Sequence, residues 1–157
     1  MKRMKSLIIG LVIILLAACS AAPAAPTPDP TQVVLDLAGK YTVQFTAEDL
    51  EPFSQADPGM VNNIGVWLWE IQPNGSFTAS QNGQFMASGN LGANGNELNI
   101  QVLRTCETCV CEGNIGRYAW TLNESGASGR KELSFRKIYD NCDVMAILLT
   151  AKPLQGN

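Results

Sequence analysis

Short runs of β-branched and aromatic residues, closed by turns rich in Asn and Gly, recur along most of the chain after residue 38. Apolar and polar residues alternate within these runs, and apolar residues at helical spacing are nearly absent. The pattern predicts an all-β fold with eight strands, over residues 39–46, 64–71, 76–80, 84–89, 97–104, 116–122, 131–138 and 145–151.

The connections between these strands are short, and several suit the tight turns that join antiparallel neighbours. Parallel strands need crossovers of about a dozen residues or more, and only the segment 47–63 is that long. Within it, Thr46 and Asp49 have the spacing of a helix capping motif, which predicts a helical turn in a lid-like loop. We therefore expect an up-and-down antiparallel meander that closes into a barrel, because closure leaves no exposed strand edges.

Alternation along the strands predicts which side chains fill the barrel. They are Tyr41, Val43, Phe45, Leu98, Ile100, Val102, Tyr118, Trp120, Leu122, Leu133 and Phe135. The second strand leaves its inward face open, because Trp67 and Trp69 share one face while Val66 and Leu68 share the other.

Four aromatic residues are candidate ligand-binding residues, because they offer wide apolar contact and polar ring edges. They are Trp67, Trp69, Tyr118 and Trp120. The alternative is core packing, since side chains can just fill an eight-stranded interior. Glu70 is a candidate recognition carboxylate or a simple rim residue, and we interpret Asp140 and Asp143 as a solvated turn rather than paired carboxylates.

The N-terminal segment has a different pattern. Three basic residues precede an apolar run over residues 7–16, which is the order of a secretion signal. The sequence Leu16-Ala17-Ala18-Cys19 resembles the lipobox of bacterial lipoproteins. The resemblance implies cleavage before Cys19, acyl chains such as palmitate on that cysteine, and attachment to a membrane of the bacterial cell envelope, facing outside the cytoplasm. A membrane-spanning anchor is the alternative, but the apolar stretch 7–18 is shorter than the roughly 20 residues that a spanning helix needs.

The segment after Cys19 is rich in Pro and Ala, with four of the eight prolines between residues 20 and 32. Such segments favour extended polyproline II and act as spacers. The sequence therefore divides into a signal peptide (1–18), a lipidated cysteine with a linker (19–32) and one β-barrel domain (33–157).

The amino-acid composition excludes several classes of functional site. The chain contains no His, which excludes a Ser/His/Asp triad and His-ligated metal sites. Removing residues 1–18 changes the formal net charge from −3 to −6, because 8 basic residues then face 14 acidic ones. Such a chain lacks the basic surface that nucleic acids require. With no phosphate loop and no convergent acid and base, we expect neither an enzyme nor a cofactor nor a resident metal.

Short motifs occur in a recognisable order along the expected barrel. They are Gly39-Lys40-Tyr41, Gly116-Arg117-Tyr118-Ala119-Trp120, Leu133-Ser134-Phe135 and Asp140-Asn141-Cys142. In this order the chain resembles lipocalin-like bacterial lipoproteins of the calycin type, with Tyr41 in place of the Trp of the lipocalin Gly-x-Trp signature. The resemblance implies a barrel that holds a small apolar or amphipathic ligand in its open mouth. We expect a monomeric domain, and the alternative function is an envelope-structural or protein-interaction module with a filled barrel.

With Cys19 assigned to lipid, four cysteines remain, Cys106, Cys109, Cys111 and Cys142. Disulfides are the default in an exported chain, and in a meander all four fall at one rim. We favour Cys106 with Cys109 and Cys111 with Cys142, because a bridge from Cys109 to Cys111 would be strained. A zinc or copper(I) site and a redox-active Cys106-x-x-Cys109 pair remain as alternatives.

Overall fold

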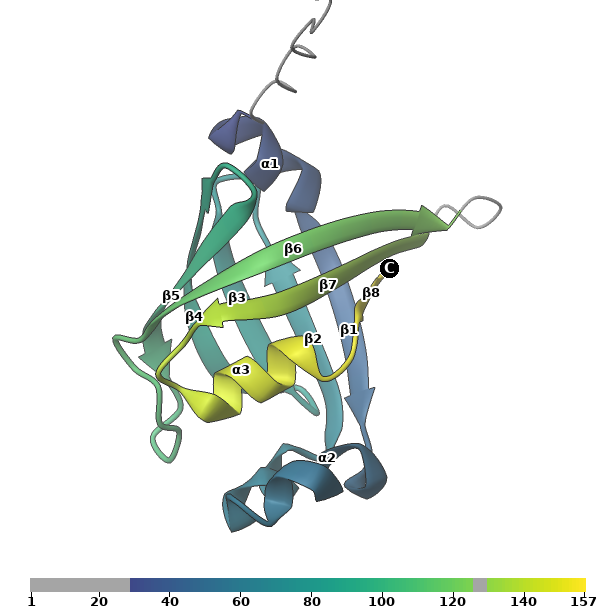
Figure 1. Cartoon of the computed structure of the whole chain (residues 1–157), viewed down its shortest axis with the longest axis vertical. Coiled ribbons are helices and arrows are strands. Elements are labelled where there is room, and N and C mark those ends of the chain that lie inside the picture. Colours follow the sequence, from purple (N-terminus) through teal and green to yellow (C-terminus); the bar gives the residue numbers. More distant parts are fainter. Residues whose placement is uncertain (1–28, 126–129) are drawn as a thin grey trace, which may run out of the picture.

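A computed structural model describes residues 29–125 and 130–157, so the predicted signal peptide, Cys19 and most of the predicted linker lie outside the described residues. Eight strands form a closed barrel in sequence order, and every neighbouring pair is antiparallel (Figure 1). The strands are β1 (Gly39–Phe45), β2 (Gly65–Ile71), β3 (Ser76–Gln81), β4 (Gln84–Asn94), β5 (Glu97–Thr105), β6 (Ile115–Ser125), β7 (Arg130–Tyr139) and β8 (Leu154–Gly156).

The predicted up-and-down meander is therefore confirmed, and the first seven strands lie close to their predicted positions. Alternation also places most of the core correctly, since nine of the eleven predicted residues are buried, whereas Trp120 and Leu122 are only partly buried. On β2 the structure settles the inward face. The side chains of Trp67 and Trp69 are 4% and 3% exposed, whereas Val66 is 45% exposed.

The predicted eighth strand at residues 145–151 is wrong, because those residues belong to the helix α3 (Asp143–Thr150). Met145, Ala146, Leu148 and Leu149 are buried, which is the spacing of one helical face. A short continuous apolar run does not distinguish a buried strand from a buried helix. The strand that closes the barrel is β8, which pairs with β1 on one side and β7 on the other.

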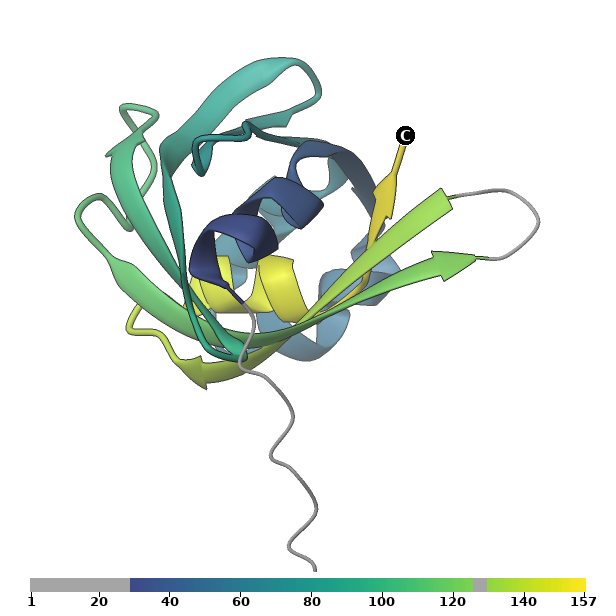
Figure 2. The same cartoon turned by 90° about the horizontal axis from the view of Figure 1, so that it is seen from above.

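The helix α1 (Pro30–Leu37) begins within the segment expected to be linker. The Asp29 carboxylate accepts a hydrogen bond from Thr31 N at 2.9 Å, which caps the helix, and proline is favoured at a first helical position. Val33, Val34 and Leu37 are buried. Viewed from above in Figure 2, α1 lies across one end of the barrel and closes it.

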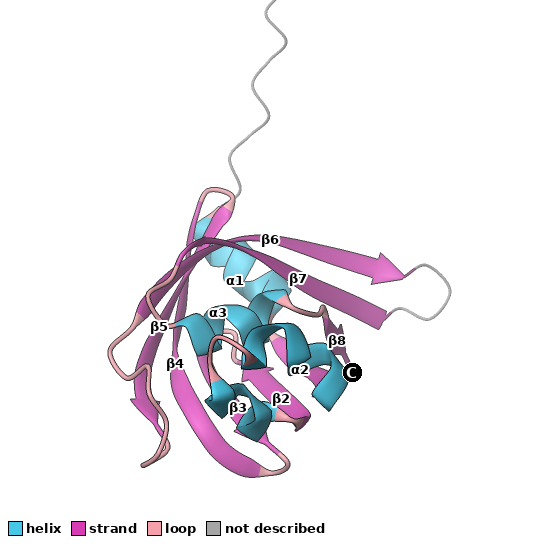
Figure 3. Ribbon diagram, turned by 60° about the horizontal axis from the view of Figure 1, so that its bottom comes forward, coloured by secondary structure: helices cyan, strands magenta, loops and turns pink. Residues whose placement is uncertain are grey.

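The opposite end carries the helix α2 (Ala47–Ser54) and a 3-10 helix, η1 (Pro58–Asn63) (Figure 3). The predicted capping motif is confirmed, because the Thr46 side chain accepts from Asp49 N while the Asp49 carboxylate accepts from Thr46 N. Leu50 and Met60 bury their side chains completely and hold this segment against the barrel. In the described part of the chain, no helix is both long enough and apolar enough to cross a bilayer.

Candidate functional site

A cavity of about 700 Å³ opens at the end of the barrel that carries α2 and η1. We call it the mouth cavity. Its apolar wall comes from β2, β3, β4 and α3, and includes Trp67, Trp69, Ala79, Ala87, Met145 and Leu148. Its rim comes from η1, from Gln81 at the end of β3 and Gln84 at the beginning of β4, and from the segment that follows β5.

The two tryptophans of β2 lie deep in this wall, so two of the four predicted ligand-binding residues line the cavity. The indole N–H of Trp67 donates to the backbone oxygen of Asn63 at 2.9 Å, which fixes the ring against η1. Trp69 stacks on Phe77, with ring centroids 5.4 Å apart. Both rings are thus held rigidly, which favours a preformed apolar surface.

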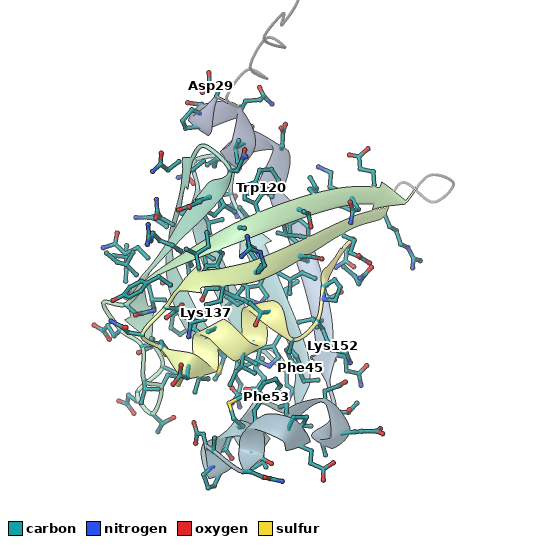
Figure 4. The ribbon with its side chains drawn as sticks, in the orientation of Figure 1. Asp29, Phe45, Phe53, Trp120, Lys137 and Lys152 are labelled. Carbon is teal, nitrogen blue, oxygen red and sulfur yellow. A yellow bond between two sulfur atoms is a disulfide. The ribbon has the colours of Figure 1, made fainter. Side chains whose placement is uncertain are left out.

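The other two predicted residues, Tyr118 and Trp120, do not line the mouth cavity. The ring of Tyr118 is completely buried and packs edge-on against Phe135, with centroids 5.9 Å apart. Trp120 lies in the half of the barrel nearer α1 (Figure 4). Its indole nitrogen is buried without a hydrogen-bond partner among the described residues. Both residues serve the core rather than the cavity.

Two disulfides reinforce the rim, and they have the favoured pairing. Cys106 is joined to Cys109 and Cys111 to Cys142, with Cα–Cα distances of 5.1 and 5.6 Å. The first three of these cysteines line the cavity. In this structure all four sulfur atoms are therefore committed to disulfides, and none is a free thiolate that could bind zinc or copper.

Two buried amides, Gln81 and Asn63, add polar groups to the cavity lining, although the sequence pattern did not indicate either of them. Gln81 Nε2 donates to the backbone oxygens of Asn62 and Ile64 at 2.8 and 3.0 Å. Asn63 Nδ2 donates to the backbone oxygen of Met60 at 3.3 Å. Within the described residues neither amide oxygen has a partner. The sequence could have indicated Gln81, because this residue comes two positions after Ala79 and therefore lies on the same inward face of β3.

The charged residues that line the mouth cavity are both acidic, Asp57 and Glu107, and both are exposed at the rim. Asp57 Oδ1 accepts from Gly59 N at 2.8 Å and caps η1, which holds this carboxylate in place. Among the described residues no Lys or Arg lines the cavity. A nearby cation, Arg104, lies over the ring of Phe85 at 6.0 Å from its centroid and is not part of the lining.

The remaining candidate carboxylates each form an ion pair or hydrogen bonds with other groups of the protein. Glu70 forms an ion pair with Lys40 and does not line the cavity. The interpretation of Asp140 as part of a solvated turn is wrong, because its side chain is buried. It accepts hydrogen bonds from the Tyr118 hydroxyl, from Asn114 Nδ2 and from Cys142 N. Asp143 is exposed and lies 3.3 Å from Lys137 Nζ.

The arrangement supplies a wide apolar wall, hydrogen-bond acceptors and two carboxylates, which suits binding of a small molecule. Comparison of the chain with protein-family models, with curated proteins and with solved structures found no match. The closed eight-stranded antiparallel barrel is compatible with a lipocalin-like fold.

Proposed function

We propose that this chain is a membrane-anchored lipoprotein of the bacterial cell envelope whose barrel binds a small apolar or amphipathic molecule. The observation that carries the proposal is the mouth cavity, whose volume of about 700 Å³ lies within the usual range for small-molecule sites. A barrel filled by its own side chains would leave no such space.

The cavity wall supports an apolar ligand because burial of hydrocarbon is the dominant source of affinity at such a surface. Each buried methylene contributes about 0.8 kcal/mol, so a ten-carbon chain contributes at most about 8 kcal/mol. That upper limit corresponds to a dissociation constant of about 1 µM. A ligand of this size therefore needs only modest help from polar groups to bind usefully.

The position of α1 supports a particular orientation on the membrane. The first described residue, Asp29, lies at the end of the barrel opposite α2 (Figure 4). If Cys19 carries the acyl chains, the anchor reaches the barrel at its closed end, and the mouth cavity opens away from the bilayer. The protein would then exchange its ligand with the surrounding medium rather than with the membrane interior.

Binding is tested with the full chain in phosphatidylcholine nanodiscs, by following tryptophan emission during titration with 1-decanol. Empty nanodiscs measure the partition of the probe into lipid. We expect saturable binding that Ala87→Phe weakens at least tenfold, because the new ring fills the cavity. The matched control Ala119→Phe adds the same volume on β6, away from the cavity lining, and should bind as the wild type does. Equal binding by both variants would contradict the assignment of the site. No binding beyond lipid partition would favour the interaction module instead.

Lipidation is tested separately, in cells that export the protein. Metabolic labelling with an alkyne-bearing palmitate should modify the wild-type chain and fail to modify Cys19→Ser. Labelling that survives this substitution would rule out Cys19 as the acylated residue.

A further inference from the structure

We propose that the mouth cavity selects ligands that carry an ammonium group on an apolar body, and that it discriminates against carboxylate amphiphiles. This inference rests on the proposed function and specifies its ligand class. It follows from the chemistry of the polar groups that line the cavity, taken together with their depth.

The formally charged side chains that line the mouth cavity are all negative. Asp57 and Glu107 line the cavity, and no cationic side chain among the described residues does. An ammonium group at the rim would be attracted to both carboxylates, whereas a carboxylate group would be repelled by both. Because Asp57 also caps η1 through Oδ1, its position does not depend on a flexible loop side chain alone.

The two buried amides also favour an ammonium group over a carboxylate. Gln81 and Asn63 are 9% and 8% exposed. The NH₂ group of Gln81 donates to two backbone oxygens, and that of Asn63 donates to the backbone oxygen and the sulfur atom of Met60. Because the protein atoms that these NH₂ groups contact are hydrogen-bond acceptors, the orientation of both amides is fixed. What each amide can still offer to a ligand is an oxygen, which accepts hydrogen bonds. An ammonium group has three N–H donors, and a carboxylate has none.

The depth of the apolar wall defines how such a ligand would lie. Trp67 and Trp69 are almost completely buried, whereas Asp57 and Glu107 are exposed. The hydrocarbon part would therefore pack against the two indole rings, and the ammonium group would remain near the rim. There it keeps part of its hydration, which avoids the large penalty of burying a charge.

The test compares three probes with ten-carbon chains that differ only in the head group, which are decylamine, 1-decanol and decanoate. Titrations use the full chain in phosphatidylcholine nanodiscs at pH 7, with empty nanodiscs as the partition reference. We expect decylamine to bind about tenfold more tightly than decanoate, which is the size expected for two partly exposed charge interactions of opposite sign for the two probes. The ratio should shrink in 1 M salt because screening weakens exposed charge pairs.

The variant that tests the mechanism is Asp57→Asn combined with Glu107→Gln. Asn also caps helices well, so the local fold should persist. The matched control is Glu48→Gln combined with Glu51→Gln, which changes the net charge equally at exposed positions of α2 outside the cavity lining. We expect the ratio of the decylamine and decanoate affinities to fall severalfold in the first variant and to stay unchanged in the second.

The outcomes separate this inference from the proposed function. Decanoate binding as tightly as decylamine, with both competing against 1-decanol, would overturn the inference and leave the apolar binding site intact. An equal fall of the affinity ratio in both double variants would also overturn it, because net charge rather than the lining would then be responsible. Failure of all three probes to bind beyond lipid partition would instead contradict the proposed function itself.

Discussion

The ammonium nitrogen of Lys152 lies 2.7 Å from Oδ2 of Asp49, although 103 residues separate them in the sequence. The same nitrogen donates to the backbone oxygen of Gln44 at 3.2 Å. This contact fastens the beginning of α2 to the segment between α3 and β8, where Lys152 is labelled in Figure 4. The hydrogen bond from Lys152, followed by those from Thr46, lowers the pKa of Asp49 to about 2.

This pKa predicts a loss of stability in acid. The carboxylate of Asp49 contributes fully above its ordinary pKa of 3.8, and the contribution disappears as the pH falls toward about 2. Thermal unfolding measured from pH 5 to pH 2 should therefore show a smaller drop in midpoint for Asp49→Asn than for the wild type. Glu51→Gln, on the same helix, serves as the control and should follow the wild-type curve. Parallel curves for all three proteins would contradict the role given to Asp49.

A second prediction concerns alkaline pH. The pKa of Tyr118 is raised well above 10, first by burial and then by its hydrogen bond to Asp140. Because the unfolded chain releases this proton near pH 10, the stabilisation is complete below pH 10 and declines above it. Urea unfolding at pH 8, 10 and 11 should show a smaller decline above pH 10 for Tyr118→Phe than for the wild type. At pH 8 the same variant should lose about 1 to 3 kcal/mol, because a hydrogen bond to a buried carboxylate is removed. A wild-type decline that Tyr118→Phe does not reduce would exclude Tyr118 as its source.

Gly116 is predicted to be intolerant of any side chain. A Cβ atom there would overlap Oδ2 of Asp140 and the ring of Tyr118, which are themselves hydrogen-bonded to each other. Gly116→Ala should destabilise the protein by about 1 to 3 kcal/mol, as overpacking of a tight site does. Gly92→Ala is the matched control, because nothing lies within 4 Å of the corresponding Cβ position. Equal denaturation midpoints for the two variants would show that the site near Asp140 can relax.

The two disulfides should differ in their contribution to stability. The Cys111–Cys142 bridge links residues 31 positions apart, whereas Cys106 and Cys109 are separated by 3. Loop-closure entropy then gives about 4 kcal/mol for the first and about 2 kcal/mol for the second. Replacing each pair by serines and measuring unfolding in urea should reproduce this order. A larger loss from removing the Cys106–Cys109 bridge would mean that it holds the cavity rim rather than a short loop.

Seven strands were predictable because their side chains face the core and the solvent in turn, as in Tyr41, Val43 and Phe45. The helix α3 was not, because a short run that is apolar on nearly every residue carries no period of two. β8 has only three residues and follows Pro153. Its strand conformation depends on pairing with β1 and β7, which the local sequence does not indicate. The prolines before residue 33 indicated a linker, so α1 was not predicted. One of these prolines, Pro30, instead begins this helix, which Asp29 caps.

The candidate site was predictable in part for similar reasons. The spacing of Trp67 and Trp69 placed both rings on one face, and the meander brought the cysteines to one rim. Gln81 could not be assigned its role, because the backbone oxygens that orient its amide belong to residues 17 and 19 positions earlier. The burial of Asp140 depends in the same way on Tyr118 and Asn114, which come from a different strand and loop.

Closure of the barrel depends on its shortest strand. β8 pairs through two residues with β1 and through two with β7, while the ladder between β6 and β7 contains Arg117 to Ser125 on one side. Without the last residues of the chain, the wall would become an open sheet whose two outer strands present unpaired backbone N–H and C=O groups. Such edges add strands from other molecules, so β8 both completes the barrel and covers the two strand edges that would otherwise invite aggregation.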